Sequence, residues 1–455
     1  MIYGLNEAAP DIGVTELVLY DVDHERANLM CALGKAVIRK QGGQLRISIS
    51  KEFDRAVADS SFVINSIRVG GMTSRANDER IVLQHGLPGQ ETTGAGGLAM
   101  ALRTIPVSVE YARSVERVAP SAWFINFTNP AGLVTQAITT CTGVRSVGIC
   151  DTPRELFHRL ALAVGASPDA VECDYFGLNH LGWVRAVWCQ GKDVMSEVLT
   201  SDEKLKSLYS ADLFDPQMIR QLGLIPTEYL YFCYAQRRAA ANQSRTNATR
   251  GEEVMRLTAE LFRRLQEDLD AGRDERAVER YTLYHRRRSG SYMKLEASAG
   301  SLFGDAVEDA ADPFTSPTGY HRIAIGVMKA LQSRTPQTLV VNTRNRGAID
   351  DLSPDDVVEV PCHVSSRGIT PLPVGTLPSS VRGLVLAVKA YERVAVEAAL
   401  ERSASKARLA LLLYPVLGQW DVASRVLQAL GEGDPQYLSY LRGNDVSASR
   451  ETVAH

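Results

Sequence analysis

The stretch that decides the fold is TELVLYDVDHERANLMCALGKAVI (15–38). Its first six residues, Thr15 to Tyr20, have the apolar pattern of a buried strand, and an amphipathic helix is predicted from Glu25 to Ile38. Asp21 and Asp23 stand between the two. A strand, an acidic turn and a helix are typical of one unit of an α/β fold.

The same alternation continues along the first third of the chain. We predict strands at 45–48, 62–67, 123–127 and 144–149, with helices at 98–118 and 133–139. This spacing predicts a doubly wound, Rossmann-like parallel sheet, whose carboxyl edge binds nucleotides. Because an acidic residue after the second strand of such a fold usually takes the ribose hydroxyls, Asp21 and Asp23 are candidate cofactor-binding residues. The alternative is that Asp23 only caps the next helix.

The glycine fingerprint of dinucleotide-binding folds, G-x-G-x-x-G, does not precede the first predicted helix. The chain opens inside what resembles that helix, at Ile2 to Glu7, and the glycines at 70–71 and 94–97 come only after the third strand. We therefore expect a sheet that lacks its first strand and a shortened N-terminus, which weakens the prediction that this chain binds a dinucleotide cofactor.

The second half has a mixed pattern. An alternating strand is predicted at 183–189, and helices are predicted at 253–269, 384–400 and 407–417. We expect two domains: a Rossmann-like, dinucleotide-binding domain at 1–149, and a mixed α+β catalytic and C-terminal domain at 150–455.

Composition narrows the class of protein. The chain has 455 residues, 45% of them apolar, and a net charge of −3, which gives no reason to expect nucleic acid or an anionic membrane as partner. Its seven cysteines are scattered without a CxxC pair, as is typical of reduced thiols in a cytoplasm. Neither a membrane span nor a signal peptide is apparent. We expect a cytoplasmic protein that forms a homodimer or homotetramer.

Two short motifs supply metal ligands. GICDTP (148–153) places Cys150 at the end of a predicted strand, and GLNHLG (177–182) carries His180. Thiolate and imidazole suit zinc, manganese or iron, and two protein ligands leave positions open for water or substrate. The alternative is a buried structural cysteine and a hydrogen-bonded structural histidine.

Polar side chains from other segments complete the candidate site. The guanidinium fork of Arg75 matches the oxygens of a phosphate, and Glu91 lies just before a glycine-rich turn. Asn129, in the turn signal Asn129-Pro130, has an amide that can face a ligand. The alternative for the segment around Arg75 is a solvated charged loop.

Five strings together resemble one family: GLPGQETTGAGG (86–97), INFTNPAGLVTQA (125–137), GICDTP, GLNH and VVNTRNRGAI (340–349). They resemble the NAD- and manganese-dependent glycoside hydrolases of family four, especially their 6-phospho-β-glucosidases. The resemblance runs from about Ile2 to about Leu430. Family members normally begin with a strand and a GGGS-type loop ahead of the present Met1.

The resemblance implies a role for each candidate. Cys150 and His180 would hold manganese, whereas Arg75 and Asn129 would contact a phosphorylated sugar. Arg288, in HRRRSGSY (285–292), matches the arginine of the family's RGG-Y element. Glu91 would raise the basicity of the catalytic tyrosine.

That tyrosine is best matched by Tyr229 in IPTEYLY (225–231), with Tyr231 and Tyr234 as alternatives. By pattern alone, this aromatic cluster is typical of a core. Asp151 would protonate the leaving oxygen. Many β-specific relatives have Asn after the cysteine and Asp is common in α-specific ones, so the anomeric preference stays open.

The family's chemistry departs from hydrolysis by two carboxylates. NAD takes hydride from C3, a base removes the C2 proton, the glycosidic oxygen leaves, water adds, and the hydride returns. A phosphorylated disaccharide or glycoside is the expected substrate. The alternatives are a 6-phospho-α-glucosidase or α-galactosidase of the same family, a lactate- or malate-type dehydrogenase, and an inactive homologue that lacks NAD binding.

Overall fold

The computed structural model describes residues 1–209, 211–290, 292–293, 297, 314, 316 and 318–443. Its strands are β1 (Glu16–Leu19), β2 (Arg46–Ile49), β3 (Phe62–Asn65), β4 (Trp123–Asn126), β5 (Arg145–Gly148), β6 (Val171–Leu178), β7 (Leu181–Cys189), β8 (Lys192–Asp193), β9 (Ile225–Pro226), β10 (Gln337–Arg344), β11 (Val357–Ser365) and β12 (Gly368–Pro371).

The helices of the first half are α1 (Ile2–Ile12), α2 (His24–Gln41), α3 (Phe53–Val57), α4 (Gly71–Gln84), α5 (Gly94–Val118), α6 (Ala131–Cys141), α7 (Thr152–Ala163), α8 (Met195–Thr200), α9 (Asp202–Ser207) and α10 (Pro216–Leu222). Those of the second half are α11 (Tyr231–Tyr234), α12 (Gln236–Ser244), α13 (Arg250–Asp270), α14 (Asp274–Gly290), α16 (Tyr320–Gln332), α17 (Ser379–Glu401), α18 (Ala404–Leu413), α19 (Trp420–Gly433) and α20 (Pro435–Leu438). None of the described helices is both long enough and apolar enough to span a membrane.

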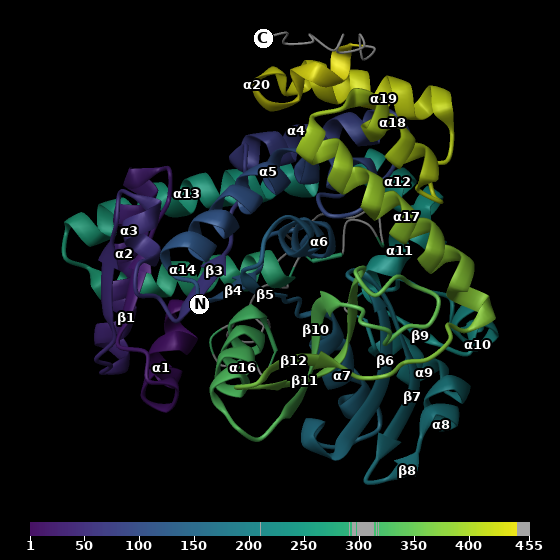
Figure 1. Ribbon diagram of the computed structural model, residues 1–455, viewed down its shortest axis with the longest axis horizontal. Coiled ribbons are helices and arrows are strands. Elements are labelled where there is room, and N and C mark those ends of the chain that lie inside the picture. Colours follow the sequence, from purple (N-terminus) through teal and green to yellow (C-terminus); the bar gives the residue numbers. More distant parts are fainter. Residues whose placement is uncertain are drawn as a thin grey trace, which may run out of the picture.

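The parallel strands of the first half form two sheets. β1 pairs only with β2, and β3 begins a separate sheet in the order β3-β4-β5, with all these pairs parallel. Figure 1 shows the pair of strands with α2 at the left and the larger sheet at the centre. In a doubly wound sheet the first strand lies between the second and the fourth. The break between β1 and β3 therefore falls where the sequence predicts a missing strand, and the α/β fold class is confirmed.

Strands from the second half extend the larger sheet. β10 pairs antiparallel with β5, and the order continues through β11 to β12. A third sheet, β6-β7-β8 with β9 paired to β7, lies beside it at the lower right of Figure 1. One buried apolar cluster runs through the larger sheet, this third sheet and the helices around them. The mixed architecture expected of the second half is therefore present, and it shares its core with the first.

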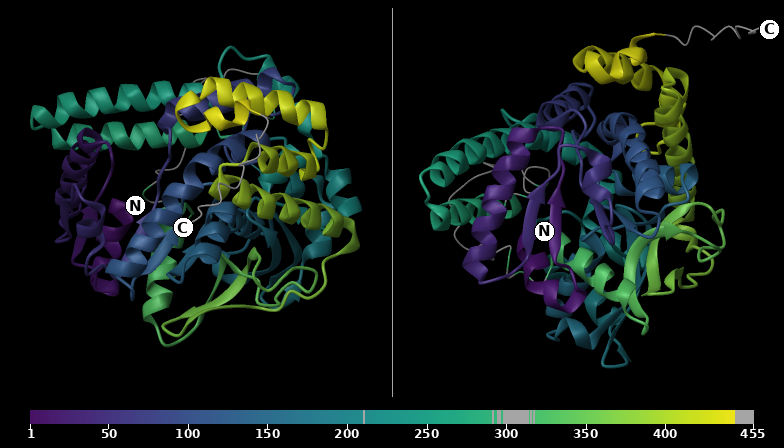
Figure 2. Two further views of the ribbon diagram at one scale, coloured as in Figure 1. Left: turned by 45° about the horizontal axis from the view of Figure 1, so that its top comes forward. Right: turned by 60° about the vertical axis from the view of Figure 1, so that its left-hand side comes forward.

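Helices of the second half also cover the first. Figure 2 shows α13 and α14 as a long antiparallel pair, and a small apolar cluster joins them to α2. In that cluster Leu29 and Leu33 of α2 meet Leu265 of α13 and Ala277 of α14. The predicted helix at 98–118 starts earlier, at Gly94, because the glycine-rich turn itself forms the first turn of α5.

A buried ion network ties the C-terminal helices to α4 and α5. Arg103 donates to Asp78 and, at 3.1 Å, to Asp434, which also accepts a 2.8 Å hydrogen bond from Ser74. All four side chains are buried. Ser74 directly precedes Arg75, so this network holds the segment of α4 that carries a candidate site residue.

Replacing Arg103 by Met should lower the free energy of unfolding by about 3–5 kcal/mol, because two buried carboxylates lose their guanidinium. Urea denaturation would measure the loss. Arg117→Met is a control on the same helix: its partner Asp54 lies at the surface, and an exposed pair contributes about 0–1 kcal/mol. Equal losses in both variants would show that the network contributes no more than a surface pair.

Candidate active site

The candidate site lies where the larger sheet meets the β6–β7 turn. A small cavity is lined by His180 and Asn179 from that turn, by Tyr229, and by Pro130 at the start of α6. The peptide bond between Asn129 and Pro130 is cis. Strand ends, a hairpin turn and a helix start therefore converge on one hollow.

His180 occupies the tip of the β6–β7 hairpin with a φ of +62°, and its side chain is buried. Burial lowers the pKa of its imidazole to about 3, so the ring is neutral at pH 7. Within the described residues, neither ring nitrogen has a hydrogen-bond partner. Buried polar atoms are rarely left unpaired, and a neutral imidazole is the form that ligates metals.

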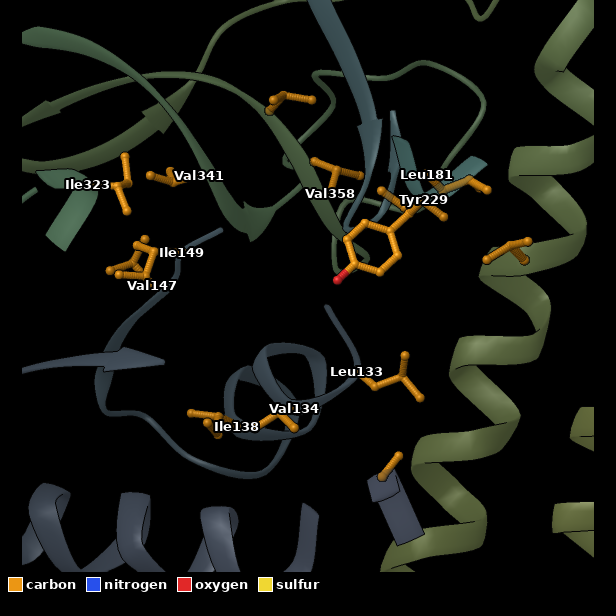
Figure 3. Packing of buried hydrophobic residues seen from close by; sticks show 14 of the residues in the cluster. Leu133, Val134, Ile138, Val147, Ile149, Leu181, Tyr229, Ile323, Val341 and Val358 are labelled. Carbon is orange, nitrogen blue, oxygen red and sulfur yellow. The ribbon is translucent and has the colours of Figure 1, made fainter. Parts of the chain in front are cut away.

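Tyr229 lies directly against His180. The two rings are stacked, with centroids 3.7 Å apart and an interplanar angle of 10°. Figure 3 shows the Tyr229 ring beside Leu181 with its hydroxyl directed away from that residue. Burial, followed by the negative charges of Glu91 and Glu228, raises the pKa of the phenol well above its usual value, and a hydrogen bond from Tyr292 opposes this.

The two alternative tyrosines lie elsewhere. The Tyr231 hydroxyl accepts a 3.1 Å hydrogen bond from Arg238, and its ring packs on Phe214. Tyr234 lies beside Trp183, and burial raises the pKa of its phenol to about 12. Of the three tyrosines, Tyr229 alone lines the cavity with His180.

Cys150 and Asp151 follow β5, as the sequence predicts. Cys150 is buried, and burial, with the charges of Glu359 and Asp151, raises the pKa of its thiol. Asp151 stands at the N-terminus of α7. Burial raises the pKa of its carboxyl to about 7, although Tyr320 donates a hydrogen bond to it. Asp151 is therefore able to carry a proton near neutral pH, as a general acid must.

Arg75 and Glu91 form a buried charge cluster. Arg75 pairs with Glu79 and Glu91 at 2.9 Å each, and Arg68 reaches the other oxygen of Glu91 at 2.5 Å. Burial opposes ionisation of Glu91, but Arg68, Arg75 and Arg288 outweigh it and lower the pKa of the carboxyl to about 2. The solvated-loop alternative for this segment is therefore wrong, because Arg75 and Glu79 are buried.

Glycine makes this cluster possible. A Cβ on Gly96 would lie 2.2 Å from the carbonyl oxygen of Gln90, so only glycine lets the loop carrying Glu91 pack on the first turn of α5. The charge of Glu91 in turn acts on His180 and Tyr229. The glycine-rich turn thus positions the Glu91 carboxylate near the cavity and is not a phosphate-binding loop.

Asp21 and Asp23 lie apart from this cluster, after β1. Asp23 caps α2 by accepting a 3.0 Å hydrogen bond from the backbone amide of Arg26. The alternative predicted for Asp23, a helix cap, is therefore confirmed. Asp21 accepts from the Asp23 amide at 2.9 Å. Both carboxylates stand at the carboxyl end of a parallel strand, where a dinucleotide fold holds ribose.

Three residues that sequence reasoning missed contact the candidates. Tyr292 hydrogen-bonds Tyr229, and Tyr320 hydrogen-bonds Asp151. Glu228 lies near Asp151, accepts a 3.4 Å hydrogen bond from Thr152, and has a pKa raised to about 7 by burial. Glu228 precedes Tyr229 in its motif and Tyr292 ends the motif HRRRSGSY, so the sequence carried a signal for both, whereas Tyr320 becomes a neighbour of Asp151 only through folding.

Cys150 and His180 suit a divalent metal in their chemistry: a buried thiol, and an imidazole with both nitrogens unpartnered. In the described part of the chain, no group of three or more His, Cys, Asp and Glu side chains is arranged to hold a metal ion. The assignment of Cys150 and His180 as metal ligands stays a prediction.

A dinucleotide-type sheet with a thiol, an imidazole and a tyrosine near its carboxyl edge defines an enzyme of the cofactor-dependent α/β class. Comparison with known families identifies it further. Residues 1–165 match the family 4 glycosyl hydrolases, and residues 175–417 match the C-terminal domain of the same family. The chain belongs to glycosyl hydrolase family 4, which confirms the resemblance and decides against the dehydrogenase alternative.

Individual relatives agree with this. The chain is 32% identical to a probable 6-phospho-beta-glucosidase of Bacillus subtilis, over 96% of this chain and 94% of that protein. It is 31% identical to the phospho-alpha-glucosidase PagL of Clostridium acetobutylicum, over 94% and 92%. The 6-phospho-beta-glucosidase of Thermotoga maritima, solved with manganese, NAD+ and glucose-6-phosphate, superposes with a TM-score of 0.78 at 28% identity, over 96% of this chain and 95% of that one.

Proposed function

We propose that this chain hydrolyses 6-phosphorylated β-glucosides, with NAD and a divalent metal, normally Mn²⁺, as cofactors. The proposal rests on the Tyr229–His180 stack, because it puts a proton acceptor against an imidazole whose nitrogens are unpartnered. When bound, NAD would exchange hydride with C3 and the metal would act as a Lewis acid on the C2 and C3 oxygens.

The chain's own residues would do the rest. Cys150 and His180 would hold the metal, Tyr229 would accept the C2 proton, and Asp151 would protonate the leaving glycosidic oxygen. A pKa of about 7 for Asp151 supports the last role, because an acid must hold its proton until the bond breaks.

The remaining candidate residues would bind the substrate and the cofactor or adjust the pKa of the base. Arg75, Asn129 and Arg288 would contact the phosphorylated sugar. Glu91 would keep the tyrosine basic, since its ionised carboxylate raises the pKa of Tyr229. Asp21 and Asp23 would lie at the ribose of NAD.

The domain division follows from these roles. Residues 1–149 would bind NAD, and residues 150–455 would carry the metal ligands, the base and the acid. We further propose a cytoplasmic enzyme that acts as a homodimer or homotetramer, which the scattered free cysteines support for the compartment.

The deciding experiment is hydrolysis of 4-nitrophenyl β-glucoside 6-phosphate with NAD and Mn²⁺, with the α-anomer assayed in parallel. Turnover of the β-anomer supports the proposal. Preference for the α-anomer would favour the 6-phospho-α-glucosidase alternative, consistent with Asp151 after the cysteine. No turnover of either anomer, together with no NAD binding by calorimetry, would favour the inactive homologue.

Removing the substrate phosphate tests its recognition. A charge-assisted hydrogen bond contributes about 1.5–3 kcal/mol, so kcat/KM for the unphosphorylated glucoside should fall by about tenfold or more for each phosphate hydrogen bond that is absent. Arg288→Met should reduce kcat/KM for the phosphorylated substrate only, whereas Arg287→Met, at an exposed neighbouring position, should not. Equal rates on the two glucosides would refute phosphate recognition.

A further inference from the structure

The β6–β7 turn holds its histidine in an unusual backbone conformation. Leu178 pairs with Leu181, so Asn179 and His180 alone form the two-residue loop. His180 has a φ of +62°, in the left-handed region that glycine adopts most readily and that Asn, Asp and His enter more often than other residues. A non-glycine residue in this region costs conformational energy and persists when its surroundings hold it there.

A buried carboxylate behind the turn supplies that support. Glu359 of β11 is 1% exposed. It accepts hydrogen bonds from the Tyr175 hydroxyl at 2.7 Å, from the Asn179 amide at 3.1 Å and from the Asn342 amide at 2.9 Å. These donors come from β6, the turn and β10, so a single side chain joins both sheets to the residue next to His180.

The same contacts reach the helix at the cavity. The Asn179 side-chain oxygen accepts a 3.3 Å hydrogen bond from the amide of Gly132 in the first turn of α6. Glycine at position 182 is needed as well, because a Cβ there would lie 2.0 Å from the Tyr175 hydroxyl. Glu359, Asn179 and Gly132 therefore form one continuous link behind His180.

Burying a carboxylate is costly unless hydrogen bonds satisfy its oxygens, and three neutral donors do so for Glu359. Glu359 lies behind the turn and does not line the cavity, whereas Asn179 and His180 do. Its carboxylate is thus placed to orient the turn rather than to bind substrate.

We propose that Glu359 is a positioning residue that fixes the Asn179-His180 turn and so presents the imidazole to the metal. This inference rests on the proposed function, in which His180 is a metal ligand. It adds to that function the residue that orients the ligand. Groups behind metal ligands typically change metal affinity or activity by about 10–100-fold when they are replaced.

The test is Mn²⁺ affinity of the full chain, measured by electron paramagnetic resonance titration without substrate. Glu359→Gln keeps the shape and removes the charge and one acceptor, and should raise the Mn²⁺ Kd by about 10–100-fold. Tyr175→Phe removes one donor to Glu359 and should raise the Kd less, which keeps the test decisive if Glu359→Gln does not fold.

The matched control is Asp356→Asn. Asp356 immediately precedes the same strand, is 3% exposed, and pairs with Arg393 at 2.8 Å rather than with the turn. It should destabilise the protein without changing the Kd for Mn²⁺. A wild-type Kd in Glu359→Gln, or an equal rise in Asp356→Asn, overturns the positioning role and leaves the proposed function intact. Absence of Mn²⁺ binding by the wild type overturns both.

Discussion

Tyr229→Phe should lower kcat by about 10²–10⁴-fold and leave Mn²⁺ binding unchanged, because only the proton acceptor is removed. The ring of the variant can still stack on His180, since that contact uses the aromatic face. Reaction of the wild type in D₂O should place deuterium at C2 of the product sugar, which direct displacement by carboxylates cannot do. Mass spectrometry of the product measures both turnover and label.

Tyr231→Phe is the matched control. Its hydroxyl is buried two residues away, but it faces Arg238 and not the cavity. The variant should lower the free energy of unfolding only modestly, because one hydrogen bond has a small net contribution. Its turnover should stay within a few-fold of the wild type. An active Tyr229→Phe enzyme, or product without deuterium at C2, would remove Tyr229 from the role of base.

Removing the metal should abolish turnover. Dialysis against a chelator would take from the proposed ligands Cys150 and His180 the ion that would stabilise the charge developed at C2, and added Mn²⁺ should restore the rate under reducing conditions. Cys150→Ser should weaken Mn²⁺ binding and should not be rescued at Mn²⁺ concentrations that saturate the wild type.

Cys362→Ser is the control for the thiol. Cys362 is also a buried free cysteine, but it hydrogen-bonds the Val360 carbonyl within β11. Its replacement should leave the metal requirement unchanged. Full activity in chelator, or equal effects of the two serine variants, would exclude a metal role for Cys150.

Most of the site's residue types could be predicted from local sequence. Cys150, Asp151 and Asn129 follow predicted strands, and chemistry at the carboxyl ends of parallel strands is a property of the fold class. The candidate base could not be identified from the pattern alone, because YLYFCY is more typical of a buried core than of a catalytic site. The stack on His180 distinguishes Tyr229 from Tyr231, and that contact joins residues 49 positions apart.

The contacts of the buried charged side chains in the site could not be predicted from the sequence. Nothing in the sequence near Glu359 indicates that it contacts Tyr175 and Asn179, which lie about 180 residues earlier. The pairing of Arg75 with Glu79 and Glu91 is likewise not indicated by the local sequence, which shows only a guanidinium suited to a phosphate. The partners of a charged side chain depend on which helices and strands pack together, and local sequence patterns do not predict this packing.

The sequence by itself determined the alternation of strands and helices and the break in the parallel sheet, because apolar periodicity and short motifs are local properties. Only the tertiary structure decided that β10 to β12 join the first sheet, that the segment around Arg75 is buried, and that a carboxylate stands behind His180. These features depend on contacts between distant segments, and such contacts form only when the whole chain buries its common core.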